Sequence, residues 1–181
     1  MSKRSDRGFT LLELLVVVAV IGIIAAIAIP GLLRARIAGN EASAIGSMRV
    51  VNSSQTAYMS SCGNGYYAST LLILGDPAPT GAGFISPDLS GAVTIDKGGY
   101  QLVMAEGSEA VAATSDGCNP SGTAANLFSS YYASNQPLVG GLSGTRWFWT
   151  NSLGTVYLSY SDDFDAVDIG NKAPSVGEAL Q

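Results

Sequence analysis

The sequence predicts an α+β protein in which one long N-terminal helix packs on a small antiparallel sheet. The first observation is an apolar run of 21 residues, 9–29, whose only charge is Glu13. The second is an amphipathic pattern after Arg34, with apolar residues at helical spacing up to about Ser61. The third is a pair of alternating runs near the C-terminus, joined by a turn at residues 151–154.

The apolar run has the length of a membrane-spanning helix. At about 1.5 Å per residue it would be roughly 30 Å long, enough to cross a bilayer core. Lys3, Arg4 and Arg7 precede it, and the positive-inside rule keeps such a leader in the cytoplasm. A carboxylate inside a spanning segment costs about 2.5–3.5 kcal/mol on insertion scales. Glu13 is therefore expected to have both a partner and a function.

This N-terminus resembles that of type IV pilins and of the pseudopilins of type II secretion. The resemblance covers about residues 1–35 and is carried by Gly8, Phe9, Thr10, Leu11, Glu13 and Pro30. It implies that prepilin peptidase cuts between Gly8 and Phe9 and that the new Phe9 amine is N-methylated. It also implies that subunits leave the inner membrane and self-associate into a helical filament, where Glu13 neutralises the Phe9 amine of a neighbouring subunit.

Two simpler interpretations of the apolar run remain as alternatives. A secretory signal peptide is suggested by Ala26-Ile27-Ala28, a small-x-small cleavage pattern, but this run exceeds the 7–15 apolar residues of such signals. A plain single-span anchor explains the hydrophobicity, but it does not explain Glu13 beside a Gly-Phe junction. The filament-subunit interpretation accounts for both.

We expect four regions: a cleaved leader at 1–8, a transmembrane and filament-core helix at 9–30, the amphipathic outer half of that helix at 31–62, and a globular domain at 63–181. Pro30 lacks the N–H that would bond to residue 26, which predicts a kink or local melting, and Gly22 is a second weak point. The helix should run from about Phe9 to Ser61 and stop at residues 62–65. Its buried residues should be Leu33, Ile37, Ile45, Met48, Val51 and Tyr58, with Arg34, Arg36, Glu41, Arg49 and Gln55 largely on other faces.

The remaining elements are short strands in a loop-rich domain. Residues 66–90 are predicted to be loop, with a short turn or helix at 67–71. Strands are predicted at 92–96, 100–105, 127–133, 145–150 and 155–160, the first two joined across Gly98-Gly99. Alternation places Trp147 and Trp149 on one face and Phe148 on the other, as sheet core rather than a carbohydrate platform. Residues 161–181 are expected to be a flexible or edge-hugging acidic tail.

The two cysteines, Cys62 and Cys118, are expected to form one disulfide in an oxidising compartment. Closing a loop of this length removes unfolded-state entropy worth on the order of 4 kcal/mol. The alternative is a pair of buried free thiols. Many pilins carry their disulfide around a C-terminal receptor-facing loop, whereas this pair would join the end of the first helix to the middle of the domain. The receptor-loop role therefore does not transfer.

Composition favours an extracellular, non-enzymatic domain without a cofactor. Removing residues 1–8 takes away three bases and one acid and changes the formal charge from −5 to −7, so no nucleic-acid site is expected. With no histidine, Ser-His-Asp sites and His-ligated zinc are excluded, and no phosphate-binding loop is present. Asp162, Asp163, Asp165 and Asp168 could bind calcium but lack the EF-hand spacing, which favours a solvated tail. The sequon at Asn52 lies inside the predicted helix, where glycosylation is hindered.

Three functions remain, and all are non-catalytic. The first is a structural subunit of a type IV pilus serving adhesion, twitching motility or DNA uptake, with prepilin peptidase and the pilus assembly platform and ATPase as partners. The second is a pseudopilin acting in the periplasm, and the third is a membrane-anchored binding protein that never polymerises. The core pseudopilin typically carries a C-terminal calcium loop on a short domain, so this longer domain favours the pilus. Glu13 argues against the tip-capping minor subunit, which lacks this acid.

Overall fold

The protein consists of a long helix and a mainly antiparallel β domain, as predicted. The computed structural model describes residues 8–79, 81–161 and 177–180, and the chain divides into two compact units, Met1–Arg36 and Ile37–Gln181. Helix α1 (Leu11–Ser61) contributes to both units, and all strands belong to the second. The four calcium candidates, Asp162, Asp163, Asp165 and Asp168, lie outside the described residues.

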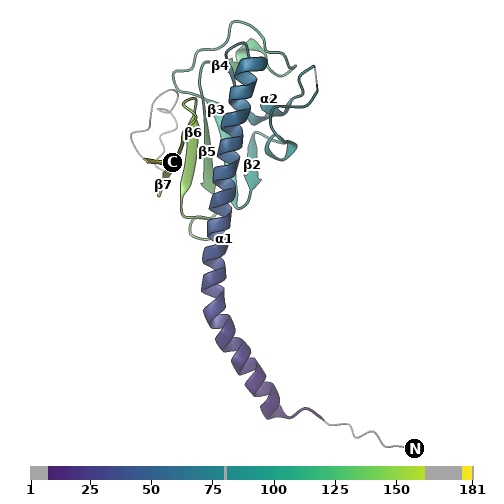
Figure 1. The fold of residues 1–181 in the computed structure, drawn as a ribbon, viewed down its shortest axis with the longest axis vertical. Helices are drawn as coiled ribbons and strands as arrows, with labels where there is room; N and C mark the ends of the chain where they lie inside the picture. Colours follow the sequence, from purple (N-terminus) through teal and green to yellow (C-terminus); the bar gives the residue numbers. More distant parts are fainter. Residues whose placement is uncertain (1–7, 80, 162–176, 181) are drawn as a thin grey trace, which may run out of the picture. The chain divides into compact units, whose positions relative to one another are not determined.

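In the described part of the chain the main sheet has six strands, and every neighbouring pair is antiparallel. Its order is β2-β3-β5-β6-β7-β8, and a second sheet pairs β1 with β4. The outer part of α1 lies across the main sheet (Figure 1). The strand bounds are β1 Tyr67–Ala68, β2 Thr94–Lys97, β3 Tyr100–Glu106, β4 Leu127–Phe128, β5 Tyr131–Pro137, β6 Trp147–Asn151, β7 Val156–Ser159 and β8 Glu178–Ala179. A short helix α2 (Leu71–Gly75) and two 3-10 turns, η1 (Pro87–Leu89) and η2 (Ala124–Asn126), complete the fold.

Both predicted hairpins are present. Gly98 and Gly99 join β2 to β3 with φ values of 59° and 76°, the left-handed conformation that a tight hairpin turn requires at both central positions. The turn between β6 and β7 closes with a backbone hydrogen bond from Gly154 to Asn151. The end of α1 at Ser61 also agrees with the prediction, and Asn64 and Gly65 follow it with positive φ.

The single strand predicted at 127–133 is wrong, because two strands of different sheets occupy this stretch. The chain leaves β4 at Ser129, whose backbone N–H donates to the Val111 carbonyl while its hydroxyl accepts from the Val111 N–H. These bonds divert the chain before it enters β5 at Tyr131. The turn predicted at 67–71 is β1 followed by α2, and β8 lies on the edge of the main sheet within the predicted tail.

The face of α1 that packs on the sheet is more polar than the prediction allowed. Met48, Val51 and Tyr58 are fully buried as expected, but Leu33 is 39% exposed, so its predicted burial is wrong. The prediction was also wrong for Glu41 and Gln55, which are 4% and 0% exposed. Hydrophobic periodicity assigns such residues to solvent, whereas here they have partners in distant parts of the chain.

The aromatic residues of β6 are mainly core, as predicted. Phe148 and Trp149 are fully buried, and Trp147 is half-buried. Phe148 pairs with Asn135, whose amide donates to the Ala44 carbonyl of α1, so this face of the sheet faces the helix. Trp149 lies on the opposite face and stacks on Tyr157 with ring centroids 4.4 Å apart.

Candidate functional site

The start of α1 is organised by Thr10 and Glu13. The backbone N–H and the hydroxyl of Thr10 donate to Oε2 of Glu13 over 3.0 and 2.9 Å. The backbone N–H of Glu13 in turn donates to the Thr10 hydroxyl over 3.2 Å. This reciprocal arrangement is a capping box, in which two side chains satisfy amides that have no partner within the helix.

The capping box corrects the expected position of the helix start. The helix begins at Leu11 rather than at about Phe9, because Thr10 takes the N-cap position. Phe9 therefore precedes the helix. The Thr-x-x-Glu spacing was visible in the sequence and would have given this start.

The first part of α1, with Phe9 before it, exposes an apolar surface in which Glu13 is the only charge among residues 9–29. Phe9, Leu11 and Leu12 are 79%, 81% and 71% exposed, and further along Ile27 is 76% exposed. By length and composition this helix can cross a membrane. An apolar surface of this extent requires a lipid environment or other apolar helices, because few soluble monomers leave such an area in water.

α1 is continuous through Pro30, so the local melting considered for this position is not seen. The kink at Pro30, the cleavage site at Gly8 and Phe9, the methylation of Phe9 and the assembly role of Glu13 remain predictions. The leader residues 1–7 lie outside the described part of the chain.

A partly buried ion pair joins α1 to the start of β6. Oε2 of Glu41 lies 2.5 Å from Nη2 of Arg146 and 2.7 Å from its Nε, and Oε1 accepts from both the N–H and the hydroxyl of Thr145. Burial raises the pKa of Glu41, but hydrogen bonds from Arg146 and Thr145 and the charge of Arg146 outweigh it, so the pKa lies below its ordinary value. The hydroxyl of Tyr100 donates to the Arg146 carbonyl, and a Cβ at Gly144 would clash with that hydroxyl.

Two further polar side chains hold α1 on the domain. Gln55 donates to the Ala68 carbonyl over 2.7 Å and accepts from the Ala68 N–H over 3.0 Å, which fixes β1 against the helix. Asn52 donates to the Gly154 carbonyl and accepts from the hydroxyls of Tyr131 and Thr150. Both polar atoms of the Asn52 side chain are thus hydrogen-bonded within the domain.

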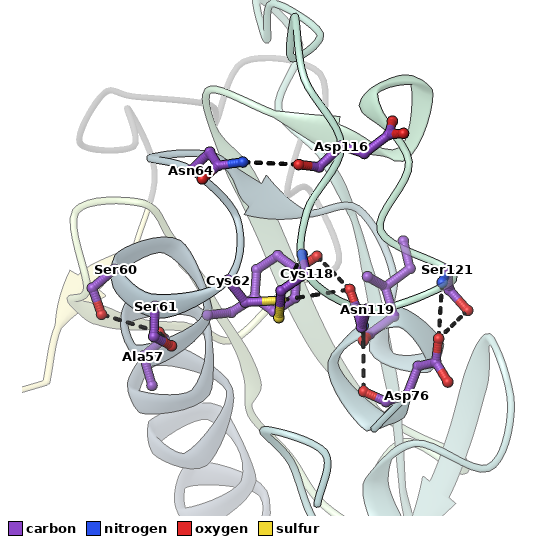
Figure 2. The surroundings of a disulfide bond; sticks show 12 residues. Ala57, Ser60, Ser61, Cys62, Asn64, Asp76, Asp116, Cys118, Asn119 and Ser121 are labelled. Carbon is purple, nitrogen blue, oxygen red and sulfur yellow. Dashed lines mark hydrogen bonds between the residues drawn. A yellow bond between two sulfur atoms is a disulfide. The ribbon is translucent and has the colours of Figure 1, made fainter. Parts of the chain in front are cut away.

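The predicted disulfide between Cys62 and Cys118 is present, with Cα atoms 4.8 Å apart. Figure 2 shows Asn119 beside it, facing Asp76. The Asn119 amide donates to the Ile73 carbonyl, and its oxygen accepts from the hydroxyl of Tyr58 over 2.9 Å. Burial, and to a smaller extent the charge of Asp76, raises the pKa of Tyr58 to about 12, so this donor stays protonated. The disulfide and Asn119 therefore join the end of α1, α2 and the loop at 116–122.

Within the described residues, no group of three or more His, Cys, Asp or Glu side chains is placed to hold a metal ion. The features that can act on a partner are instead the apolar surface of α1 and the carboxylate at its start.

Comparison with known proteins identifies this N-terminal segment. Residues 3–29 match the prokaryotic N-terminal methylation motif. The N-terminal segment therefore carries the prokaryotic N-terminal methylation motif. Over 55 residues the chain is 40% identical to the type IV major pilin protein PilA of Myxococcus xanthus. This alignment covers 30% of the chain and 25% of that relative. No solved structure matches the chain.

Proposed function

We propose that the chain is a structural subunit of a type IV pilus. One observation carries the proposal: a methylation motif leads directly into a capped helix whose apolar surface is left exposed by the described residues of the chain. In the inner membrane this surface faces lipid, and in a filament it faces the same helices of other subunits. Prepilin peptidase cuts between Gly8 and Phe9, and the Phe9 amine is then methylated.

Glu13 fits a role in assembly because its position in an apolar filament core requires compensation. An ionised carboxylate in a low-dielectric interior is strongly disfavoured unless a cation and hydrogen bonds accompany it. Thr10 supplies two hydrogen bonds within the subunit. The Phe9 amine of a neighbouring subunit supplies the cation once cleavage has released it. Such a pair would form only at the correct axial offset between subunits, and it would therefore set their register.

The second unit is suited to the outer surface of a filament. Its helix and sheet are held together by the Glu41–Arg146 pair, by Gln55 and by the disulfide, which suits a domain exposed to the extracellular medium. On the cell surface this domain would serve adhesion, twitching motility or DNA uptake. The assembly platform and its ATPase would extract the subunit from the inner membrane.

The alternative is a pseudopilin of type II secretion, which shares the processing motif and works in the periplasm. The partial similarity to a major pilin favours the pilus. Deletion of the gene should remove surface pili, seen by electron microscopy, while secretion of exoproteins continues. Loss of secretion with normal pili would support the pseudopilin instead.

The mature N-terminus provides the test of family-type processing. Mass spectrometry of the exported subunit should find a chain beginning at methylated Phe9. A chain beginning at Met1, or one beginning after Ala28, would contradict the proposal. A start after Ala28 would identify a secretory signal peptide, and a start at Met1 would be the result expected of a plain anchor.

A further inference from the structure

The loop between β5 and β6 presents an apolar surface that the proposed function does not use. Leu138, Val139 and Leu142 are 48%, 52% and 57% exposed. All three lie in the loop between β5 and β6, where the Leu142 N–H donates to the Val139 carbonyl, and this loop lies next to α1 (Figure 1). Residues 133–145 contain no charged residue, although the mature chain has a net charge of −7. We refer to Leu138, Val139 and Leu142 as the apolar loop.

The apolar loop is an ordered structure whose backbone groups are largely bonded. The N–H groups of Leu142 and Ser143 donate to the Val139 carbonyl over 3.1 and 2.9 Å. The N–H of Val139 donates to the Ser143 hydroxyl, and the N–H of Gly141 donates to the Gly144 carbonyl. Internal bonding of this kind lowers the cost of moving backbone into a weakly hydrated environment, where an unpaired N–H is expensive.

The loop is fixed to α1 close in sequence to the membrane-spanning segment. The side-chain amide of Asn40 donates to the Ser143 carbonyl over 2.8 Å. Asn40 is only seven residues beyond Leu33, the last apolar residue before Arg34. Seven residues rise about 10 Å as a helix and span at most about 25 Å when fully extended. The headgroup region on one side of a bilayer is about 5–8 Å thick, so the loop is tethered within reach of it.

We propose that the apolar loop inserts into the lipid headgroup region of the membrane before the subunit is assembled. This inference rests on the membrane insertion of α1 in the proposed function. The absence of charge in the loop suits a lipid surface, since a carboxylate there would be repelled by anionic headgroups and would be costly to dehydrate. The loop would give the domain a fixed orientation on the membrane, and extraction would have to release it.

A fluorescent probe on the loop tests this proposal in the full mature chain. Both native cysteines are in the disulfide, so Leu142→Cys introduces one reactive thiol for an environment-sensitive fluorophore. Leu153→Cys is the matched control, because Leu153 is similarly exposed, at 52%, but lies at the other end of β6. The apolar loop precedes this strand, and the turn that contains Leu153 follows it. The labelled chains are inserted into phosphatidylethanolamine and phosphatidylglycerol vesicles.

The probe at position 142 should emit at shorter wavelength and be quenched several-fold more by headgroup-level spin-labelled lipid than the probe at 153. Iodide in the aqueous phase should instead quench the probe at 153 more strongly than the probe at 142. Adding Val139→Asp to the labelled chain should expose the probe at 142 to water, so that its emission and quenching resemble those of the probe at 153. These results are expected at every subunit-to-lipid ratio, because the contact is with lipid.

Three results would overturn the proposal. Equal iodide quenching at both positions, in a chain that floats with the vesicles, would refute the loop contact and leave the membrane anchor intact. Protection that appears only at high subunit density would identify a second copy of the chain as the contact. A chain that does not float with the vesicles would contradict both the loop contact and the proposed anchor.

Discussion

Removing either partner of the Glu41–Arg146 pair should destabilise the domain, but by different amounts and with different pH dependence. The Arg146 side chain is 30% exposed and can regain water after Glu41→Gln, whereas the Glu41 side chain is 5% exposed and cannot regain it after Arg146→Met. We expect Glu41→Gln to lower the free energy of unfolding by about 2 kcal/mol, the value of a hydrogen bond to a charged group. Arg146→Met should cost about 3–5 kcal/mol at neutral pH, because it leaves a buried carboxylate without its cation.

The pH dependence follows from the direction of each pKa shift. In the native domain the pKa of Glu41 is lowered, so its stabilising contribution is complete above the unfolded-state pKa of about 4.3 and is lost as the pH falls through the folded-state pKa. Glu41→Gln removes this contribution, so its destabilisation should shrink as the medium becomes acidic. In Arg146→Met the buried carboxylate should have a raised pKa. The penalty of that variant should therefore begin to shrink at a higher pH.

Urea unfolding of the full mature chain in detergent, followed by tryptophan fluorescence, measures these changes. Both tryptophans lie in β6, directly after Arg146. Lys97→Met is the matched control, since the Lys97–Asp88 pair is short at 2.6 Å but 42% and 54% exposed, and exposed pairs are worth about 0–1 kcal/mol. The double variant should lose less than the sum of the single variants. Single-variant losses no larger than that of the control, or strict additivity, would refute the reasoning.

Three further predictions concern assembly and the other anchors. Glu13→Leu should still insert into the membrane but should reduce filament yield severely. Thr10→Val loses the bonds of the Thr10 hydroxyl but keeps the carboxylate and its bond from the Thr10 N–H, so it should retain most of the yield. Normal filaments from Glu13→Leu would contradict the assembly role. Cys118→Ser should lower the free energy of unfolding by on the order of 4 kcal/mol relative to the oxidised chain, measured with and without reductant. An unchanged stability would show that the bond with Cys62 does not form in the exported subunit. Gln55→Leu should cost about 1–3 kcal/mol because it leaves the buried β1 amide unpaired, and faster hydrogen exchange confined to β1 would locate the loss.

The sequence by itself determined the features that depend on local pattern. An apolar run interrupted only by Glu13 specifies a helix that requires lipid or other helices, whatever the rest of the chain does. Gly98-Gly99 specifies a tight hairpin, because few other residue pairs adopt its left-handed turn. Alternation in β6 predicted that Phe148 and Trp149 lie on opposite faces, and a single pair of cysteines left one disulfide to form.

The tertiary structure alone decided which polar residues of α1 are buried and where the short strands lie. Glu41 and Thr145 are 104 residues apart, and no local pattern could show that one would meet the other. A polar side chain is assigned to solvent unless its partner is known, and the partner is known only once the chain has folded. β1 and β4 have two residues each, so their own sequences carry little preference, and their pairing depends on long-range contacts such as that of Gln55 with Ala68.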